Sequence, residues 1–491
     1  MNAKVIFVFP LMFSCIASAQ LPGTFTSTGS MITPRVQHSA TLLPDGKVLI
    51  AGGLNFSPYS FLDSAELYDP SIGAFTPTGS MAVPRSAHTA TLLPNGTVLI
   101  AGGEVTFPDG SASVRASAEI YNPSTGTFTS AGNMTTPRAG HTATLLNNGM
   151  VLIAGGAPSG RTAELYDSST GTFNPTGDMT IARSSHRATL LATGKVLIVP
   201  GGLGKDYQAE LYDPSSGTFN PTGWLTTVGG VAYTANLVNS GAVLVVLAPG
   251  DCDYPQADAQ LYDPATQEFS ATARMVMPRC YETGTSLSDG SVLISGGLGV
   301  CGVSYDGSIS CSNSYSAELY DSGSQRFIST GNMITSVTSF TTTLLKDGTV
   351  LIAGGIDAIG PLNSPIAGAE IYHPLSVTAP PALFSLWGDG RGQGAIWHSA
   401  TGQIASGGMP AVTGEPLSMY TTSLVDGSVI PPQVAIGGQL AEILFFGAAP
   451  GYPGFNQVNV RVPAGIAPGS AVPVRLTYLG RPSNDVTIAV Q

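Results

Sequence analysis

Four histidines recur at one position of a repeated pattern, each eight residues before a glycine and three residues after an arginine. They are His38, His88, His141 and His186. Imidazole nitrogens commonly ligate metals, so a ring of histidines could in principle hold an ion. Ligands on separate repeats diverge, however, while a metal needs bonds of about 2 Å. We therefore predict no metal and no cofactor, and structural histidines that bond to neighbouring backbone. Three further repeats have Tyr233, Glu282 and Phe340 at this position.

An arginine and a glutamate recur together in most repeats. The arginines are Arg35, Arg85, Arg138, Arg183 and Arg279, and the glutamates are Glu66, Glu119, Glu164, Glu210, Glu318 and Glu370. One repeat has Gln260 at the glutamate position, and it also has Gly230 at the arginine position. This covariation between repeats predicts buried ion pairs such as Arg35–Glu66, which would make these carboxylates poor acid–base catalysts. We expect no catalytic residue among them.

Aromatic and acidic residues gather in the variable loops of the repeats, most of them in the loop that follows the double glycine. The candidate ligand-binding residues are Phe56, Tyr59, Phe107, Asp251, Asp253, Tyr254, Tyr281 and Tyr305, and Phe61 and Tyr315 stand in the same loops. Aromatic rings that stack, beside acids that accept hydrogen bonds, suit sugars or peptides. The alternative is that they are ordinary loop residues with no role in binding. Asp251 and Asp253 could contribute to a calcium site, but two carboxylates are too few to indicate one.

The cysteines favour disulfides. Cleavage after residue 19 would leave four, an even number in an exported chain. We pair Cys301 with Cys311, which stand in one loop, and Cys252 with Cys280. Free buried thiols remain the alternative.

The elements that position these residues follow from seven similar segments, of which the first is TLLPDGKVLIAGG. Each has a turn glycine, usually after Asp or Asn, between two apolar runs, which predicts a hairpin of strands a and b. The turn glycines are Gly46, Gly96, Gly149, Gly194, Gly241, Gly290 and Gly348. A third strand, c, carries a tyrosine such as Tyr68, and six of the seven repeats have a phenylalanine such as Phe75 seven residues later, in strand d.

The last repeat lacks this phenylalanine, but Phe25 stands in an orphan GTFTSTGSM segment near the start. We predict that this segment supplies strand d of the last repeat. Seven four-stranded sheets would then close into a ring, because a single sheet with two apolar faces must pack against neighbours on both sides.

The double glycine after strand b (Gly52 and Gly53), the strand c tyrosine and the later aromatic resemble the kelch repeat. The resemblance covers about residues 24–374. It implies a seven-bladed β-propeller of the galactose oxidase type, in which the b–c and d–a loops emerge on one face. That family holds copper with histidines and tyrosines, one of which is crosslinked to a cysteine. Tyr281 falls where the crosslinked tyrosine is expected, but Ser339 and Phe340 replace a Tyr-His pair, which disfavours a copper site.

A second domain follows the repeats. We expect a proline-rich linker at 375–382 and an antiparallel β-sandwich at 383–491, because short alternating apolar runs fill this part of the chain. It resembles an immunoglobulin-like domain found at the end of many secreted bacterial proteins, which implies a packing or adaptor role. The predicted fold class is therefore all-β, with a propeller at 20–374 and a sandwich after it.

Composition excludes several classes of protein. The 491 residues carry a net charge of −12 with only 19 basic residues, so no nucleic-acid partner is indicated. Residues 1–19 fit a signal peptide, with Lys4, an apolar run and Ala17-Ser18-Ala19, and no later run is long enough to span a membrane. A lipid anchor on Cys15 is the minor alternative. We expect a secreted monomer, extracellular or periplasmic.

Three functions remain open. The first is a binding scaffold that recognises a glycan or protein on its loop-rich face. The second is an enzyme of the galactose oxidase-like or another kelch type, and the third is a structural surface component. The sequence favours the first, because it shows no cluster of acid, base or metal ligands.

Overall fold

The computed structural model describes residues 23–106, 111–158, 160–201, 207–226, 230–249, 257–303, 309–357, 364–374, 383, 393–421, 432–449, 456–478, 481–483 and 486–491. The chain divides into two compact units, one spanning residues 22–375 and the other residues 376–491 together with the first 21 residues. The predicted signal peptide and the predicted linker 375–382 lie outside the described residues. No helix in the described parts of the chain is long and apolar enough to cross a membrane.

The larger unit consists of seven four-stranded antiparallel sheets, here called blades 1 to 7. From strand a to strand d, blade 1 contains β2 (Ser39–Leu42), β3 (Val48–Ala51), β6 (Ala65–Asp69) and β7 (Ala74–Pro77), and blade 2 contains β8 (Thr89–Leu92), β9 (Val98–Ala101), β12 (Ser117–Asn122) and β13 (Thr127–Asn133). Blade 3 contains β15 (Thr142–Leu145), β16 (Val151–Ala154), β18 (Ala163–Asp167) and β19 (Thr172–Pro175), and blade 4 contains β20 (Arg187–Leu190), β21 (Val196–Val199), β22 (Gln208–Asp213) and β23 (Thr218–Trp224). Blade 5 contains β24 (Gly230–Leu237), β25 (Val243–Pro249), β26 (Ala259–Asp263) and β27 (Glu268–Ala271), and blade 6 contains β28 (Thr283–Ser286), β29 (Val292–Ser295), β32 (Ala317–Asp321) and β33 (Arg326–Ser329). Blade 7 contains β34 (Thr341–Leu344), β35 (Val350–Ala353), β38 (Ala369–His373) and β1 (Thr24–Ser27).

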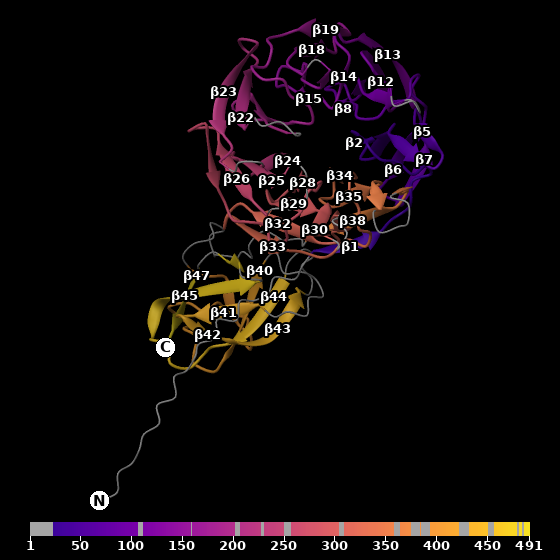
Figure 1. Cartoon of the computed structure of the whole chain (residues 1–491). Helices are drawn as coiled ribbons and strands as arrows, with labels where there is room; N and C mark the ends of the chain where they lie inside the picture. The colour runs from indigo at the N-terminus through magenta and orange to yellow at the C-terminus, as the bar shows by residue number, and fades with distance from the viewer. Residues whose placement is uncertain are drawn as a thin grey trace, which may run out of the picture. The chain divides into compact units, whose positions relative to one another are not determined.

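The blades form a closed ring (Figure 1). Strand a of each blade contacts strand a of the next, from β2 through β8, β15, β20, β24, β28 and β34 and back to β2. β1 pairs with β38 so that Phe25 lies opposite Tyr372, and their ring centroids are 4.8 Å apart. The predicted seven-bladed propeller, closed by its N-terminal strand, is therefore confirmed.

The apolar strand b of each blade supplies both interfaces of that blade. In β3, Val48 and Ile50 pack in a cluster with blade 7, whereas Leu49 and Ala51 pack in a cluster with blade 2. Side chains alternate between the two faces of a strand, so four consecutive apolar residues are buried on opposite sides. This is why the VLIA motif is apolar throughout rather than alternating with polar residues.

The double glycine after strand b lets two blades approach closely. Gly52 has φ +63°, and a Cβ atom there would lie 2.6 Å from the carbonyl oxygen of Arg85 in the next repeat. Gly53 has φ +98°, and a Cβ atom there would lie 2.7 Å from the carbonyl oxygen of Val36. Any other residue would push the neighbouring d–a segment away.

The recurring tyrosine of strand c links two blades. The Tyr68 ring packs 4.8 Å from Phe75 within its own blade, and its hydroxyl lies 2.8 Å from Thr28 Oγ1 at the end of the preceding blade. Five further tyrosines make the same hydroxyl contact, at distances of 2.8–2.9 Å. Around Tyr166 the threonine position holds Ala131. The tyrosine and the phenylalanine therefore hold neighbouring blades together at their outer strands, c and d.

Short hairpins extend the b–c loops. They are β4 (Leu54–Phe56) with β5 (Tyr59–Phe61), β10 (Glu104–Thr106) with β11 (Ala112–Val114), β30 (Leu298–Val303) with β31 (Ile309–Asn313), and β36 (Ile356–Asp357) with β37 (Ser364–Pro365). In blade 3, β17 (Ala157–Pro158) instead pairs with β14 (Arg138–Ala139). Val36 in the d–a segment bridges to Leu54, and equivalent bridges occur in three other blades. The d–a and b–c segments therefore emerge together, on what we call the loop face.

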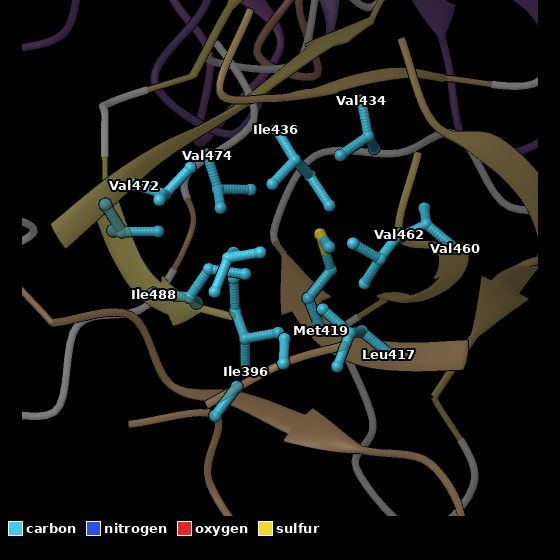
Figure 2. Packing of buried hydrophobic residues seen from close by; sticks show 14 of the residues in the cluster. Ile396, Leu417, Met419, Val434, Ile436, Val460, Val462, Val472, Val474 and Ile488 are labelled. Atoms are coloured by element: carbon cyan, nitrogen blue, oxygen red, sulfur yellow. The ribbon is translucent and has the colours of Figure 1, made fainter. Parts of the chain in front are cut away.

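The smaller unit is an antiparallel sandwich of two sheets. One sheet contains β39 (Ile396–His398), β40 (Pro416–Thr421), β44 (Asn456–Arg461) and β43 (Glu442–Ala448), and the other contains β42 (Gln439–Leu440), β41 (Gln433–Ile436), β45 (Gly469–Tyr478), β46 (Arg481–Pro482) and β47 (Val486–Val490). Figure 2 shows their inward side chains, including Met419 and Val460 from one sheet and Ile436 and Val474 from the other. The predicted sandwich is thus confirmed, with its strands alternating in burial as expected.

Candidate functional site in the axial cavity

A frame of buried ion pairs positions the d–a segments of the loop face. Arg35 Nη2 lies 2.7 Å from Glu66 Oε1, and Nη1 donates to the carbonyl oxygen of Gly52 at 2.8 Å. Glu66 also accepts the backbone N–H groups of Ile32 and Thr33 at 2.7 and 3.1 Å. Four other blades have the same pair: Arg85–Glu119, Arg138–Glu164, Arg183–Glu210 and Arg279–Glu318. The predicted pairs are therefore present, but the arginine precedes strand a, so each pair anchors the d–a segment, rather than strand a itself, to strand c.

The d–a segments end at a cavity of about 1010 Å³ on the ring axis. Its wall is built from residues at or just before the start of strand a, including Gln37, His88, Gly140, Tyr281 and Ser339. At the position before the repeated histidine, six of the seven blades have a residue with φ between +51° and +63°. The chain turns sharply there, so side chains at this position face the axis rather than a neighbouring blade.

The repeated histidines clamp one blade to the next. His88 Nε2 lies 2.9 Å from Ser39 Oγ, the first residue of strand a in the preceding blade. His38, His141 and His186 contact Thr341, Thr89 and Thr142 in the same way at 2.9–3.0 Å. Burial lowers the pKa of all four histidines to about 3, so they are neutral at physiological pH. His38 and His88 also have backbone hydrogen bonds of the kind that the sequence predicted, and the contact with a hydroxyl of the neighbouring blade is an addition to that prediction.

This clamp pattern ends at blades 4 to 6. Arg187 takes the hydroxyl position in blade 4, and Tyr233 takes the histidine position in blade 5. Arg187 Nε donates to the carbonyl oxygen of Tyr233 at 2.6 Å and Nη1 donates to that of Ser185 at 3.1 Å. Both side chains line the cavity. Burial lowers the pKa of Arg187, an effect that Glu282 partly opposes.

Glu282 takes the histidine position in blade 6. The residue lines the cavity although it is only 4% exposed, and neither carboxylate oxygen accepts a hydrogen bond from any other described residue. Burial raises the pKa of Glu282 to about 7, although its own backbone N–H, Arg279 and Arg187 favour the charged form. A buried, unsatisfied carboxylate is costly to keep. It is therefore a candidate for a group that a ligand satisfies.

Two tyrosines complete this side of the cavity. The rings of Tyr233 and Tyr281 meet edge to face with centroids 5.2 Å apart, and Tyr281 is 45% exposed. Burial raises the pKa of Tyr233, so its hydroxyl keeps its proton. Beneath them, Cys280 is buried, packs against Tyr233 and is disulfide-bonded. Arg187, Tyr233, Tyr281 and Glu282 are hereafter called the polar–aromatic cluster.

The structure separates the eight candidate ligand-binding residues. Tyr281 belongs to the axial cavity, and Phe56 and Tyr59 lie on the β4–β5 hairpin of blade 1. The others, Phe107, Asp251, Asp253, Tyr254 and Tyr305, lie outside the described residues. Sequence reasoning missed Arg187, and it counted Tyr233 and Glu282 only as variants of a structural position. The available signal was that they depart from an otherwise regular repeat.

The predicted cysteine pairs are partly visible. Cys301 and Cys311 lie directly opposite each other in the β30–β31 hairpin. Cys252, the predicted partner of Cys280, lies outside the described residues. Both pairings therefore stay predictions.

No protein-family model matches the chain, and no curated protein matches it either. Among solved structures, it is similar to one described as a novel fungal alcohol oxidase with catalytic diversity among the AA5 family, in complex with copper. The sequence identity is 16%, the match covers 96% of this chain and 99% of that chain, and the TM-score is 0.57. A second structure, described as that of YjhT, shares 15% identity and covers 72% of this chain and 96% of that chain, with a TM-score of 0.43.

At this identity, the likeness to the oxidase shows a shared galactose oxidase-type fold. The cavity residues do not fit a copper site of that type. The described residues contain no group of three or more His, Cys, Asp or Glu side chains placed to hold a metal ion. Phe340 and Ser339 stand where the Tyr-His pair would be, and the sulfur of Cys280, next to Tyr281, is already committed to a disulfide.

Proposed function

We propose that this protein binds carbohydrate, and that the axial cavity receives the end of the sugar. The observation that carries the proposal is Glu282, a buried carboxylate in the cavity wall that accepts no hydrogen bond from any other described residue. Opposite charge is supplied by Arg187, whose Nε and Nη1 are bound to backbone carbonyl oxygens and whose Nη2 donates to none of the described residues. The cavity therefore offers one strong acceptor and one strong donor.

A sugar ring matches this arrangement. Neighbouring hydroxyl groups can donate to the two oxygens of Glu282, while ring or hydroxyl oxygens accept from Arg187. The exposed ring of Tyr281 provides a face for the apolar C–H side of the sugar. The cavity is at the upper end of the range of small-ligand sites, so it has room for more than one ring.

The energetic effect should be large at Glu282. A hydrogen bond to a charged group contributes about 1.5–3 kcal/mol, more than a neutral one. Two hydroxyl donors would also remove the cost of leaving the buried carboxylate unsatisfied. We expect Glu282→Gln to weaken sugar binding at least tenfold, which corresponds to about 1.4 kcal/mol.

A glycan and peptide array, followed by titration calorimetry, tests the proposal. The wild-type protein should bind one or more glycans, and Glu282→Gln and Arg187→Gln should each lose that binding. Glu268→Gln is the matched control, because it makes the same charge change at an exposed position on the outer strand of blade 5. Binding to peptides alone, or glycan binding that Glu282→Gln leaves unchanged, would overturn the proposal.

The other two functions have their own signatures. An enzyme would convert a bound glycan to a new product, which mass spectrometry of the incubated ligand would detect. A structural surface component would bind nothing on the array and would tolerate substitution of the polar–aromatic cluster. We rank the structural role below binding, because it leaves the buried Glu282 carboxylate of the cavity wall unexplained.

We also propose that the protein is a secreted monomer with two disulfides. The support is the signal-like segment at residues 1–19 and the four later cysteines. The mass of the exported protein should correspond to a chain that begins at Gln20, reduced by four hydrogens. A mass retaining residues 1–19, or one with four free thiols, would contradict this proposal, and so would a dimer in light scattering.

A further inference from the structure

An aromatic surface lies on the loop face, on the β4–β5 hairpin of blade 1. The rings of Phe56 and Tyr59 are stacked with an interplanar angle of 11° and centroids 6.4 Å apart. Phe61 meets Tyr59 edge to face at 5.8 Å. Tyr59 is 51% exposed, so its ring is available to a ligand. We call these three residues the aromatic platform.

The hairpin is held rigidly against the propeller. Leu54 and Val36 exchange two backbone hydrogen bonds of 2.9 and 3.0 Å, and Leu62 N–H donates to the carbonyl oxygen of Gly53 at 2.9 Å. At the tip, Asn55 is buried and its Oδ1 accepts the backbone N–H of Ser57 at 3.1 Å. The rings are therefore presented at a defined position, which lowers the entropy that binding would cost.

The base of the platform's hairpin is linked to a residue of the cavity wall. Val36, which anchors the base of the hairpin at Leu54, is followed directly by Gln37, which lines the cavity. From Leu54 to the turn after Phe56 the strand extends about 10 Å, at about 3.4 Å per residue. A ligand that leaves the cavity over Gln37 would therefore reach the platform within a few sugar units.

We propose that the aromatic platform is a second carbohydrate subsite and that the ligand of this protein is an oligosaccharide, which binds with one end in the cavity and its distal units on Phe56 and Tyr59. This inference rests on the proposed function of the cavity. Aromatic faces stack on the apolar side of sugar rings whatever their hydroxyl pattern. The polar–aromatic cluster would thus select the terminal unit, and the platform would add affinity in proportion to length.

A length series tests this proposal. The probes are neutral oligosaccharides of one to six units, namely β-1,4-linked glucose, mannose and xylose, titrated by calorimetry against the intact protein. For the sugar that binds, the affinity of the wild-type protein should rise about tenfold between one and six units. Tyr59→Ala should abolish this gain and leave the affinity for the single unit unchanged, while Tyr59→Phe should retain the gain. Ile72→Ala is the control, because Ile72 is 69% exposed in blade 1 but lies in the turn between β6 and β7.

The outcomes separate the two proposals. Affinity that does not depend on length, or that Tyr59→Ala lowers equally for one unit and six, overturns the platform while the cavity proposal stands if Glu282→Gln still weakens binding. Failure of every probe and every array glycan to bind overturns both. A loss of the length gain in Ile72→Ala would also refute the platform, because the effect would then not be specific to the hairpin.

Discussion

Acid should weaken the propeller through the four histidine clamps between its blades. The unfolded-state pKa of histidine is about 6.5, and burial lowers the folded-state pKa of each clamp to about 3. Below pH 6.5 the unfolded chain therefore binds protons that the folded chain does not bind. The free energy of unfolding then falls as the pH falls, and the contribution of the clamps is complete only above pH 6.5.

The size of this effect follows from the structure. At pH 5.5, one such histidine reduces the free energy of unfolding by about 1.4 kcal/mol, and four together by about 6 kcal/mol. This value hardly depends on the folded-state pKa as long as that pKa stays near 3. A unit of about 350 residues has an unfolding entropy of about 0.7 kcal/mol/K, so the four clamps should lower Tm by about 8 °C.

Differential scanning calorimetry of wild type and His88→Gln at pH 8 and pH 5.5 isolates one clamp. The variant should be less stable at pH 8, and its deficit should shrink by about 1.4 kcal/mol, or about 2 °C, at pH 5.5. His373→Gln, which makes the same substitution at an exposed histidine in β38 outside the four clamps, is the control. If the loss of stability of His88→Gln relative to wild type is the same at both pH values, the conclusion that His88 is buried in its neutral form is wrong.

Three further predictions concern other parts of the propeller. Glu66→Gln leaves the buried Arg35 without its counter-charge, so it should lower the free energy of unfolding by about 3–5 kcal/mol and Tm by about 4–7 °C. Glu268→Gln, at an exposed position, should change Tm by less than about 1 °C. Phe25→Ala and Phe128→Ala each remove a ring that packs 4.8 Å from a tyrosine, so both should cost about 3 kcal/mol in denaturant unfolding, and a harmless Phe25→Ala would contradict closure by β1. The pKa of Glu282 is about 7 in the folded chain and 4.5 in the unfolded chain, so the folded chain binds the proton more tightly. The free energy of unfolding of the wild type should therefore fall by about 3 kcal/mol between pH 4.5 and pH 8, relative to that of Glu282→Gln. If the two proteins lose the same free energy of unfolding over this range, the raised pKa is wrong.

The fold could be predicted because its determinants are local and repeated. Each hairpin is encoded by a turn glycine such as Gly46, whose φ is +93°, and each blade by apolar residues such as Leu49 at fixed spacing. Even the non-local closure left a local trace, since Phe25 lacked a tyrosine in its own segment and Tyr372 lacked a phenylalanine. The repetition supplied five examples of the same interaction, which is what made the Arg35–Glu66 pair recognisable.

The site could be predicted only in part, because it depends on departures from the repeat. Arg187, Tyr233 and Glu282 are separated by about 50 residues each, and nothing in their sequence neighbourhoods shows that they share one cavity. The sequence could also not show that His88 bonds to Ser39, because the register between two blades depends on the packing of their faces. Positions in a repeat protein that abandon the shared residue are therefore the first places to look for ligand chemistry.

The pairing of β1 with β38 has a consequence for how the molecule is made. During synthesis, the segment that emerges first must wait for a partner that emerges about 345 residues later. The ring therefore closes late in synthesis. In growing chains that end before residue 373, blade 7 is incomplete and β1 has no complete partner strand. A ribosome that stalls in this region, or a protease that trims residues 24–27, would release an open ring whose free edge is a template for another chain.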